Sequence, residues 1–243
     1  MIISFANNKG GVGKTTTTFN VGHGLANSKK KVLMIDMDPQ TNLSTALGVF
    51  YKPKLSIYNL LLDECKIDEA IIKKSDKLHF IASTIDLSVM EFDNTQTVVN
   101  SLKEILEPVK SKYDYILIDT PPGFGTLSIN SIQAADKVFI PVIPDFFSYQ
   151  GLTQFSNVVH SINPNAEIGG IIITHYDKRK VLVRDFADGI AEQFGDKLMK
   201  TYIRENITIS EAIAKGQDVF TYNSRSNGAL DYSQLTKDIL KIK

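Results

Sequence analysis

A glycine-rich loop between a short apolar run and a helix-forming segment constrains this chain more than any other feature. The run Ile2 to Ala6 is strand-sized and mostly apolar, and Thr16 to Asn27 has the composition of a helix. Glycines let the loop backbone bend so that successive N–H groups converge on an anion, and the helix adds its positive N-terminal end. This order predicts a phosphate-binding cradle made of Lys9, Gly10, Gly11, Val12, Gly13, Lys14, Thr15 and Thr16.

Apolar runs of strand length recur along the rest of the chain, with helix-forming stretches between them. They are Val32 to Ile35, Leu78 to Ala82, Tyr115 to Ile118, Val138 to Val142 and Ile168 to Thr174. Runs such as Tyr115 to Ile118 are apolar at every position, so both faces of the sheet should be covered. We therefore predict an α/β chain with a three-layer P-loop NTPase fold, in which helices flank a mostly parallel twisted sheet on both faces.

Helices are predicted in the stretches between and after these runs. Besides Thr16 to Asn27, they are Thr95 to Leu106, Gly151 to Ser161, Val183 to Phe194 and Ala229 to Ile242. Gly22 and Gly24 lower the helix propensity of the first one and indicate close packing there. No linker or repeat interrupts the alternation, so residues 1–243 are expected to form a single domain. The stretch Tyr51 to Ser75 gives no clear pattern.

Composition excludes several classes of protein. Lys plus Arg and Asp plus Glu both number 27, so the net charge is zero and any nucleic-acid binding must come from a local patch. Cys65 is the single cysteine, which allows no internal disulfide and disfavours an iron–sulfur reductase. No apolar run approaches the ~18 residues of a membrane span, and the N-terminus lacks a signal sequence. A cytoplasmic protein without membrane contact is expected.

Two side chains of the glycine-rich loop have specific roles in such cradles. Lys14 is placed to reach terminal phosphates, and the hydroxyl of Thr15 is the usual Mg²⁺ ligand. The strict pattern G-x-x-x-x-G-K-[ST] fails because its first position is Asn8. The chain follows the variant K-G-G-x-G-K-[ST] instead, with Lys9 as the opening lysine. Taken alone, Lys9 is equally compatible with a solvated lysine before a turn.

Carboxylates follow two of the predicted strands. Asp36 and Asp38 share the same parity after Val32 to Ile35, so both can face the phosphate side. Asp119 ends the run from Tyr115 and has the position of a Walker B aspartate. Ligands of open α/β sheets bind at such carboxyl ends. Strand-end turns, in which Asp-Pro is common, are the alternative explanation, and they account for one aspartate better than for several.

With these motifs in place, the chain resembles the ParA/MinD family of deviant Walker A ATPases, and within it the small ParA and Soj partition ATPases. The resemblance runs nearly end to end. It implies that Lys9 crosses an ATP-sandwiched homodimer to the phosphates of the other subunit, so that Lys9, Lys14 and Asp38 are catalytic. It also implies that Thr15, Asp36 and Asp119 hold Mg²⁺, directly or through water, and that Asp38 orients the attacking water.

In the second half, Ile203 to Ala212 is similar to the family segment I-P-R-N-x-x-x-x-E-A, which borders adenine and contributes to DNA binding. The resemblance places Asn206 at the nucleotide. Arg204 and Glu205 stand where the family has proline and arginine, which weakens the inherited DNA contact. Replacement cations are available in a cluster formed by Lys178, Arg179, Lys180 and Arg184. Asp177, before that cluster, is interpreted as a turn residue.

The resemblance implies an ATP-driven, nucleoid-associated partition switch. ATP closes a dimer that binds DNA nonspecifically, and a ParB-like centromere-binding partner stimulates slow hydrolysis. A MinD-like or other positioning ATPase, acting on a membrane or a protein assembly, is the alternative. A nucleotide sensor with negligible turnover is a third possibility.

Overall fold

The centre of the molecule is a seven-stranded sheet in the computed structural model, which describes residues 1–92 and 96–242. The strands are β1 (Ile2–Phe5), β2 (Val32–Asp36), β3 (Ile72–Lys73), β4 (Leu78–Ile81), β5 (Tyr115–Asp119), β6 (Lys137–Val142) and β7 (Glu167–Ile173). Their order is β3-β4-β2-β5-β1-β6-β7, and β3 is antiparallel to β4 while the other pairs are parallel. All six predicted strands are confirmed, and β3 lies in the stretch that gave no clear pattern.

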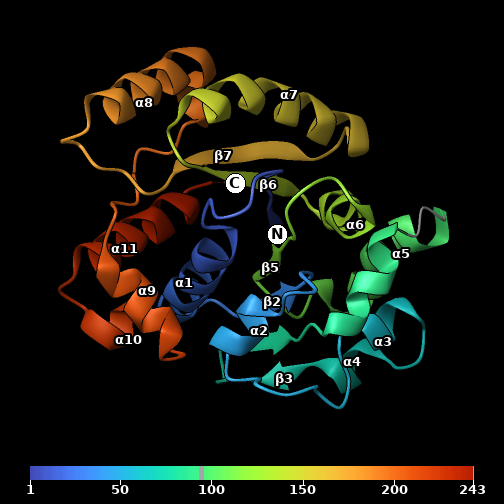
Figure 1. Ribbon diagram of the computed structural model, residues 1–243. Coiled ribbons are helices and arrows are strands. Elements are labelled where there is room, and N and C mark those ends of the chain that lie inside the picture. The colour runs from blue at the N-terminus through green and yellow to red at the C-terminus, as the bar shows by residue number, and fades with distance from the viewer. Residues whose placement is uncertain (93–95, 243) are drawn as a thin grey trace.

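Helices cover both faces of the sheet, as predicted (Figure 1). They are α1 (Lys14–Asn27), α2 (Asn42–Ala46), α3 (Ile57–Leu61), α4 (Ile67–Ala70), α5 (Gln96–Lys110), α6 (Thr126–Ala134), α7 (Phe146–Ile162), α8 (Val181–Phe194), α9 (Ile207–Ala214), α10 (Val219–Asn223) and α11 (Asn227–Ile239), with 3₁₀ segments at Ile85–Phe92 and Gly195–Lys197. No helix in the described ranges is long and apolar enough to span a bilayer.

The predicted helices are found, and two of them end at Asn27 and Phe194 as predicted, while the other ends differ. The helix expected from Gly151 begins at Phe146 because Asp145 caps it, accepting a hydrogen bond from Ser148 N. The helix predicted from Thr95 to Leu106 corresponds to α5, and its expected first residue, Thr95, lies outside the described residues. The helices α2, α6, α9 and α10 were not expected from the sequence, and α3 and α4 lie in the stretch that gave no clear pattern.

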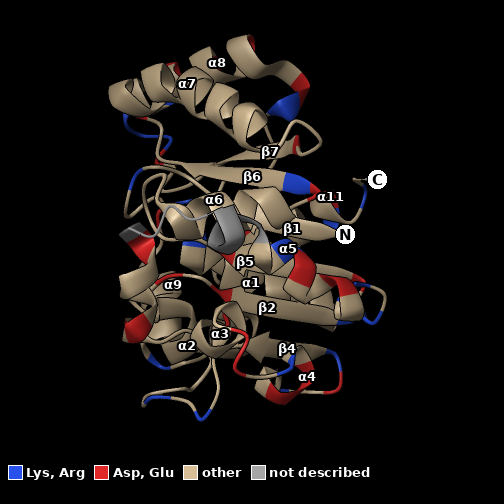
Figure 2. Cartoon of the chain, turned by 90° about the vertical axis from the view of Figure 1, so that its right-hand side faces the viewer, with Lys and Arg blue, Asp and Glu red and all other residues tan. Residues whose placement is uncertain are grey.

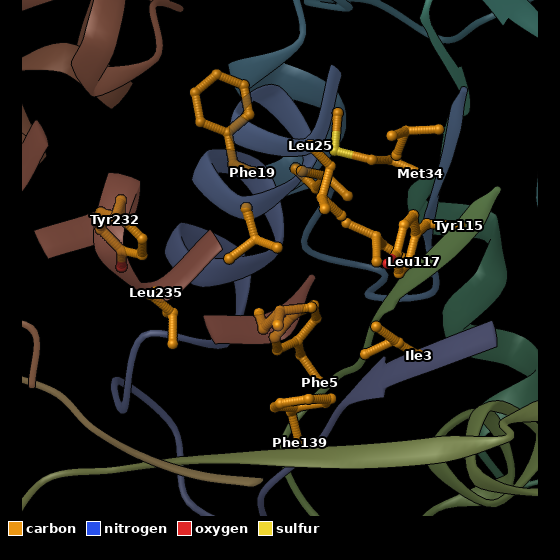
Figure 3. Close-up of a cluster of buried hydrophobic side chains, with 14 of the residues drawn as sticks. Ile3, Phe5, Phe19, Leu25, Met34, Tyr115, Leu117, Phe139, Tyr232 and Leu235 are labelled. Atoms are coloured by element: carbon orange, nitrogen blue, oxygen red, sulfur yellow. The ribbon is translucent and has the colours of Figure 1, made fainter. Parts of the chain in front are cut away.

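One face of the sheet packs against α1 and α11 in a large apolar cluster (Figure 3). Phe5 and Phe139, from neighbouring strands, have ring centroids 5.8 Å apart, and Tyr232 and Leu235 reach the cluster from α11. The opposite face packs against α3 to α6, and the β6–β7 half against α7 and α8. Burial on both faces explains why the strands are apolar at every position.

Close packing around α1 depends on its two glycines. A Cβ on Gly22 would overlap the Met34 side chain of β2, and a Cβ on Gly24 would overlap Thr236 of α11. The close packing indicated by the sequence is therefore confirmed, and α1 touches both neighbours through backbone.

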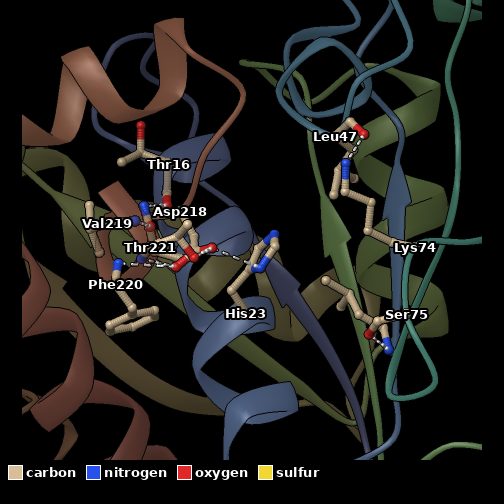
Figure 4. Close-up of polar contacts among 11 residues, drawn as sticks. Thr16, His23, Leu47, Lys74, Ser75, Asp218, Val219, Phe220 and Thr221 are labelled. Atoms are coloured by element: carbon tan, nitrogen blue, oxygen red, sulfur yellow. Dashed lines mark hydrogen bonds and ion pairs between the residues drawn. The ribbon is translucent and has the colours of Figure 1, made fainter. Parts of the chain in front are cut away.

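Polar contacts tie the same helix to α10 (Figure 4). His23 Nδ1 lies 3.3 Å from Asp218 Oδ2, and Asp218 caps α10 by accepting hydrogen bonds from Phe220 N and Thr221 N. The amide of Asn20 accepts a hydrogen bond from Val219 N at 3.0 Å. The helix that follows the glycine-rich loop is thus fixed on several sides.

Candidate functional site

The sequence motifs converge because three parallel strands end side by side. Asp119 at the end of β5 is in register with Asp36 of β2 and with Phe5 of β1. The glycine-rich loop leaves β1, so it lies at the same edge as both aspartates. Ends of parallel strands at one sheet edge form the usual ligand crevice of open α/β folds.

The loop has the backbone geometry of an anion cradle. Gly11 has a φ of 73° and Gly13 a φ of 89°, conformations that residues with a side chain rarely adopt. The base of the loop is fixed by Asn7, which donates a hydrogen bond to Pro141 O and accepts one from Lys9 N. Gly13 is the N-cap of α1 and has no side-chain cap, so the first N–H groups of α1 remain available to an anion.

The two lysines of the loop lie in different surroundings. Lys14 is buried, and its Nζ donates a hydrogen bond to Lys9 O at 2.9 Å. Burial lowers the Lys14 pKa, although Asp119 and Asp38 act in the opposite direction. Lys9 Nζ instead lies 3.1 Å from Asp145 Oδ1 and 3.1 Å from Ser148 Oγ, at the start of α7. Only Lys14 therefore faces the carboxylates beneath the cradle.

Asp36 and Asp119 are fully buried next to each other. Burial raises the pKa of Asp36 to about 6, although its carboxylate accepts hydrogen bonds from the backbone and hydroxyl of Ser44. Burial, followed by the charge of Asp36, also raises the Asp119 pKa well above its usual range. Two adjacent carboxyls with raised pKa values favour a nearby cation.

These residues fit a magnesium ion held mainly by water and phosphate. Among the described residues, Asp119 Oδ2 is buried without a hydrogen-bond partner, and Thr15 hydrogen-bonds the same carboxyl. The described part of the chain contains no group of three or more His, Cys, Asp and Glu residues that could cage a metal. Mg²⁺ commonly uses one or two protein groups, several waters and substrate phosphates, so Thr15, Asp36 and Asp119 suit it.

Asp38 has features of both interpretations that the sequence left open, a strand-end turn and a carboxylate on the phosphate side. Its carboxylate accepts a hydrogen bond from Gln40 N at 2.9 Å, which makes it a turn residue. It is also buried at the same edge, and its charge acts on the pKa values of Lys14 and Asp119. The turn therefore holds a carboxylate beside the cradle.

The loop after β5 touches the cradle directly. Gly123 N donates a hydrogen bond to Asn8 O at 3.1 Å, and Thr120 Oγ1 donates one to Phe5 O at 2.9 Å. A displacement of one loop would therefore strain hydrogen bonds to the other.

A cavity of about 290 Å³ extends from Gly13 and Thr16 toward the C-terminal helices. Asn206 lines it and caps α9, accepting a hydrogen bond from Thr208 N at 2.9 Å. Arg204, also on the wall, is clamped to Asp231 by a 2.6 Å contact from its Nη2. The sequence did not reveal this clamp, because the two residues are 27 positions apart and their pairing depends on where α11 packs.

The proposed cation cluster is partly neutralised in the structure. Asp177 accepts hydrogen bonds from the backbone and guanidinium of Arg179, which hold its pKa at about 2, and Lys180 Nζ lies 3.0 Å from Glu205. Asp177 is thus a turn residue, as interpreted. Lys178 and Arg184 have no ion pair among the described residues.

Comparison with known proteins identifies the family. A family model described as AAA domain matches residues 1–168. Chromosome partitioning protein ParA of Caulobacter vibrioides is 37% identical over 98% of this chain and 93% of its own length. Sporulation initiation inhibitor protein Soj of Bacillus subtilis is 38% identical over 98% of this chain and 97% of its own. The chain belongs to the ParA/Soj family.

Solved structures support the same fold for this ParA/Soj family member. The cell division ATPase MinD of Pyrococcus furiosus superimposes with a TM-score of 0.83 at 25% identity, covering 99% of this chain and 98% of that one. Cobyrinic acid a,c-diamide synthase of Mycobacterium smegmatis, solved with an ATP analog and magnesium, gives 0.83 at 26% identity over 99% and 94%. The resemblance to ParA/MinD proteins and the fold class are both confirmed.

Proposed function

We propose that the chain is a ParA-type partition ATPase that binds Mg-ATP, pairs with a second copy and hydrolyses ATP. The backbone cradle, Lys14 and the paired aspartates support ATP as the ligand. The similar fold of a synthase solved with an ATP analog and magnesium supports the same choice.

The position of Lys9 is the observation that carries the proposal of a dimer. Its ammonium lies at the rim of the site, with a side chain 33% exposed, while Lys14 fills the cradle below. A cation outside its own cradle can reach the phosphates of a facing copy. It would then stabilise transition-state charge in trans, as an arginine finger does.

We assign a role to each of the remaining residues. The N–H groups of Gly10 to Thr16 and the Lys14 ammonium would bind the phosphates, and Asn206 would border the base. Thr15, Asp36 and Asp119 would hold Mg²⁺, which neutralises phosphate charge. Asp38, fixed by its turn, would orient the attacking water.

DNA binding and a stimulating partner complete the proposal. Charges of both signs are scattered over the side shown in Figure 2, in agreement with the net charge of zero. Nonspecific contact to DNA phosphates would then depend on local cations, and Lys178 and Arg184 are the members of the cluster without an ion pair in the part of the chain that the structure describes. Two weak patches joined by ATP-driven pairing add avidity. A ParB-like protein would stimulate hydrolysis, with the dimer on the nucleoid.

Light scattering tests the pairing. We expect a monomer with ADP, a dimer with ATP, and a persistent ATP dimer in D38A because hydrolysis is blocked. The variant K9A should bind nucleotide and stay monomeric, whereas K103A, at an exposed position of α5, should behave like wild type. A wild-type mass that is the same with and without ATP would contradict the proposal.

The similarity to the cell division ATPase MinD favours one alternative, a positioning ATPase that acts on a membrane or protein assembly. Sedimentation of the ATP form with plasmid DNA or with anionic liposomes separates the two. Binding to liposomes alone would exclude the partition function.

A further inference from the structure

A glutamate with no role in the site described above contacts the loop that follows β5. Glu91 lies near the end of the 3₁₀ segment Ile85–Phe92, and Leu87 and Met90 of that segment share an apolar cluster with α6. The loop itself, residues 120–125, joins β5 to α6, and we call it the β5–α6 loop. Its first half lies beside the phosphate cradle and its second half lies against Glu91.

Gly125 leaves the space that the Glu91 side chain occupies. A Cβ at position 125 would overlap the Glu91 carboxyl group at both Oε1 and Cδ. The backbone of Gly125 has a φ of −68° and a ψ of 174°, which residues with a side chain also adopt. Glycine at this position is therefore explained by the closeness of Glu91 and not by the conformation of the backbone.

The Glu91 carboxylate caps α6. Gly125, the N-cap residue of α6, has no side chain that could accept a hydrogen bond from the first turn of the helix. Leu127 N donates a hydrogen bond to Glu91 instead. A carboxylate at a helix N-terminus satisfies a free N–H group and also interacts favourably with the helix dipole. The start of α6, and with it the end of the β5–α6 loop, is thus held by another segment of the chain.

The same carboxyl group lies within electrostatic range of Asp38. Burial raises the pKa of Glu91, and the charge of Asp38 acts in the same direction. Glu91 Oε2 is buried and has no hydrogen-bond partner among the described residues. Native proteins rarely retain such an oxygen without a reason, because an unpaired buried acceptor costs free energy. The position of Glu91 beside the proposed site is therefore costly, and the contact with α6 is the interaction that offsets this cost.

On its other side the β5–α6 loop is bonded to the cradle. Thr120 Oγ1 donates to Phe5 O, and Gly123 N donates to Asn8 O. The loop is therefore fixed to the cradle at two points and to Glu91 at its far end. Loss of the Glu91 contact would free one end of a segment whose middle touches the cradle.

We propose that Glu91 is a positioning residue for ATP hydrolysis, which fixes the β5–α6 loop against the cradle through Gly125 and Leu127 N. In this role Glu91 touches neither nucleotide nor metal. Its loss would let the loop shift relative to Asp119 and slow the hydrolytic step, whereas binding of nucleotide to the cradle and Lys14 would persist. The effect on hydrolysis rests on the proposed ATPase function, and the anchoring of the loop does not.

Steady-state kinetics of the full chain with Mg-ATP tests the effect on hydrolysis. In E91A, kcat should fall at least about tenfold while KM stays within about twofold of wild type, since slight misplacement of groups around reacting atoms can cost about 100-fold. E91Q keeps an oxygen that can accept from Leu127 N, so it should lie closer to wild type than E91A does. E104A, at an exposed position of α5, is the control. An unchanged kcat in E91A, or a raised KM without a loss of kcat, would overturn the role in hydrolysis.

Alanine at position 125 tests the contact from its other side. G125A should displace Glu91, so it should lower kcat as E91A does and also lower the melting temperature through overpacking. The double variant G125A/E91A should melt higher than G125A because the clash is gone, but its kcat should stay low because the anchor is missing. G151A should lose neither property, since nothing lies within 4 Å of a Cβ there. Recovery of kcat together with the melting temperature in the double variant would show that Glu91 only fills space, against the proposal.

Limited proteolysis measures the anchor without any ATPase assay. Phe124 of the loop is 37% exposed and stacks on Phe155 with ring centroids 5.2 Å apart. Chymotrypsin should cut after Phe124 at least about threefold faster in E91A than in wild type, because cleavage follows local opening. Cleavage after Tyr51, which is 90% exposed, is the internal reference and should not change.

The two assays fail separately. A wild-type chain that hydrolyses no ATP would contradict the proposed function, and faster cleavage after Phe124 in E91A would still support the anchor. Equal cleavage after Phe124 in E91A and wild type would overturn the anchor whatever the ATPase activity.

Discussion

Lys9 Nζ and Asp145 Oδ1 lie 3.1 Å apart, although the two residues are separated by 136 positions. The contact exists because β6, which leads to Asp145, is the neighbour of β1, which leads to Lys9. The same carboxylate oxygen accepts the capping hydrogen bond from Ser148 N at 2.6 Å. The lysine proposed to act on another subunit is therefore held by the start of α7 in its own.

Replacing the Asp145 carboxylate by an amide should favour formation of the dimer. Asparagine caps a helix as well as aspartate does, so D145N should keep α7 and lose only the ion pair. A partly exposed pair contributes at most about 1 kcal/mol, so the ATP-dependent dimer should tighten about two- to fivefold. Sedimentation velocity with ATP measures this, and D76N, which removes an exposed ion pair elsewhere, is the control. Unchanged or weaker dimers would show that the contact does not restrain Lys9.

Removing the buried lysine of the cradle should strongly weaken nucleotide binding. In K14A the phosphates lose a charge-assisted hydrogen bond worth about 1.5–3 kcal/mol, so affinity should fall at least about tenfold. Fluorescence titration with a labelled ATP analogue measures the loss. The control is K103A, an exposed lysine of α5, which should bind as wild type does. Equal affinity in K14A would place the phosphates elsewhere.

Filling the contact between α1 and α11 should destabilise the fold. In G24A the new methyl group overlaps Thr236, and such overpacking costs about 1–3 kcal/mol. The double variant G24A/T236A should recover part of the loss, because the side chain that clashes is shortened. G151A is the opposite control, since nothing lies within 4 Å of a Cβ there and alanine favours the helix by about 0.5–1 kcal/mol. Chemical denaturation of the four proteins measures these differences.

The buried histidine of α1 should make stability depend on pH. Burial lowers the His23 pKa below its ordinary value, with Asp218 opposing and Lys74 adding to the effect. Below pH ~6.5 the unfolded chain takes up a proton that the folded chain resists, so this contribution to stability is lost as pH falls. H23Q should therefore lose less stability than wild type between pH 8 and pH 5.5. H160Q, at an exposed position of α7, should stay within about 0.5 kcal/mol of wild type at either pH.

The strands and the convergence of the aspartates were predictable for a physical reason. Strands covered on both faces must be apolar throughout, and the ends of parallel strands meet at one edge. The motifs after β1, β2 and β5 therefore had to meet once those strands were neighbours. The register of Asp36 with Asp119 follows from this arrangement.

The helices and contacts that were not predicted depend on tertiary structure more than on local sequence patterns. In α6, Ser128 and Ser131 are buried, and their hydroxyls bond to Pro121 O and Leu127 O, so polar residues occupy core positions. The start of α7 depends on Asp145 as its N-cap, and aspartate is one of the residue types from which a helix start can be predicted. The pairing of Lys9 with Asp145 and of Arg204 with Asp231 depends on the order of strands and helices in space.

The clamp between Arg204 and Asp231 joins α11 to the wall of the cavity that begins at Gly13. The next residue, Tyr232, lines the cavity of about 290 Å³ beside Asn206, and its hydroxyl lies 3.3 Å from Thr17 Oγ1, so one turn of α11 forms part of the cavity wall. Backbone amides of that turn would slow their exchange with deuterated solvent when the cavity fills. Deuterium exchange in α11 would thus report nucleotide occupancy without an attached fluorophore.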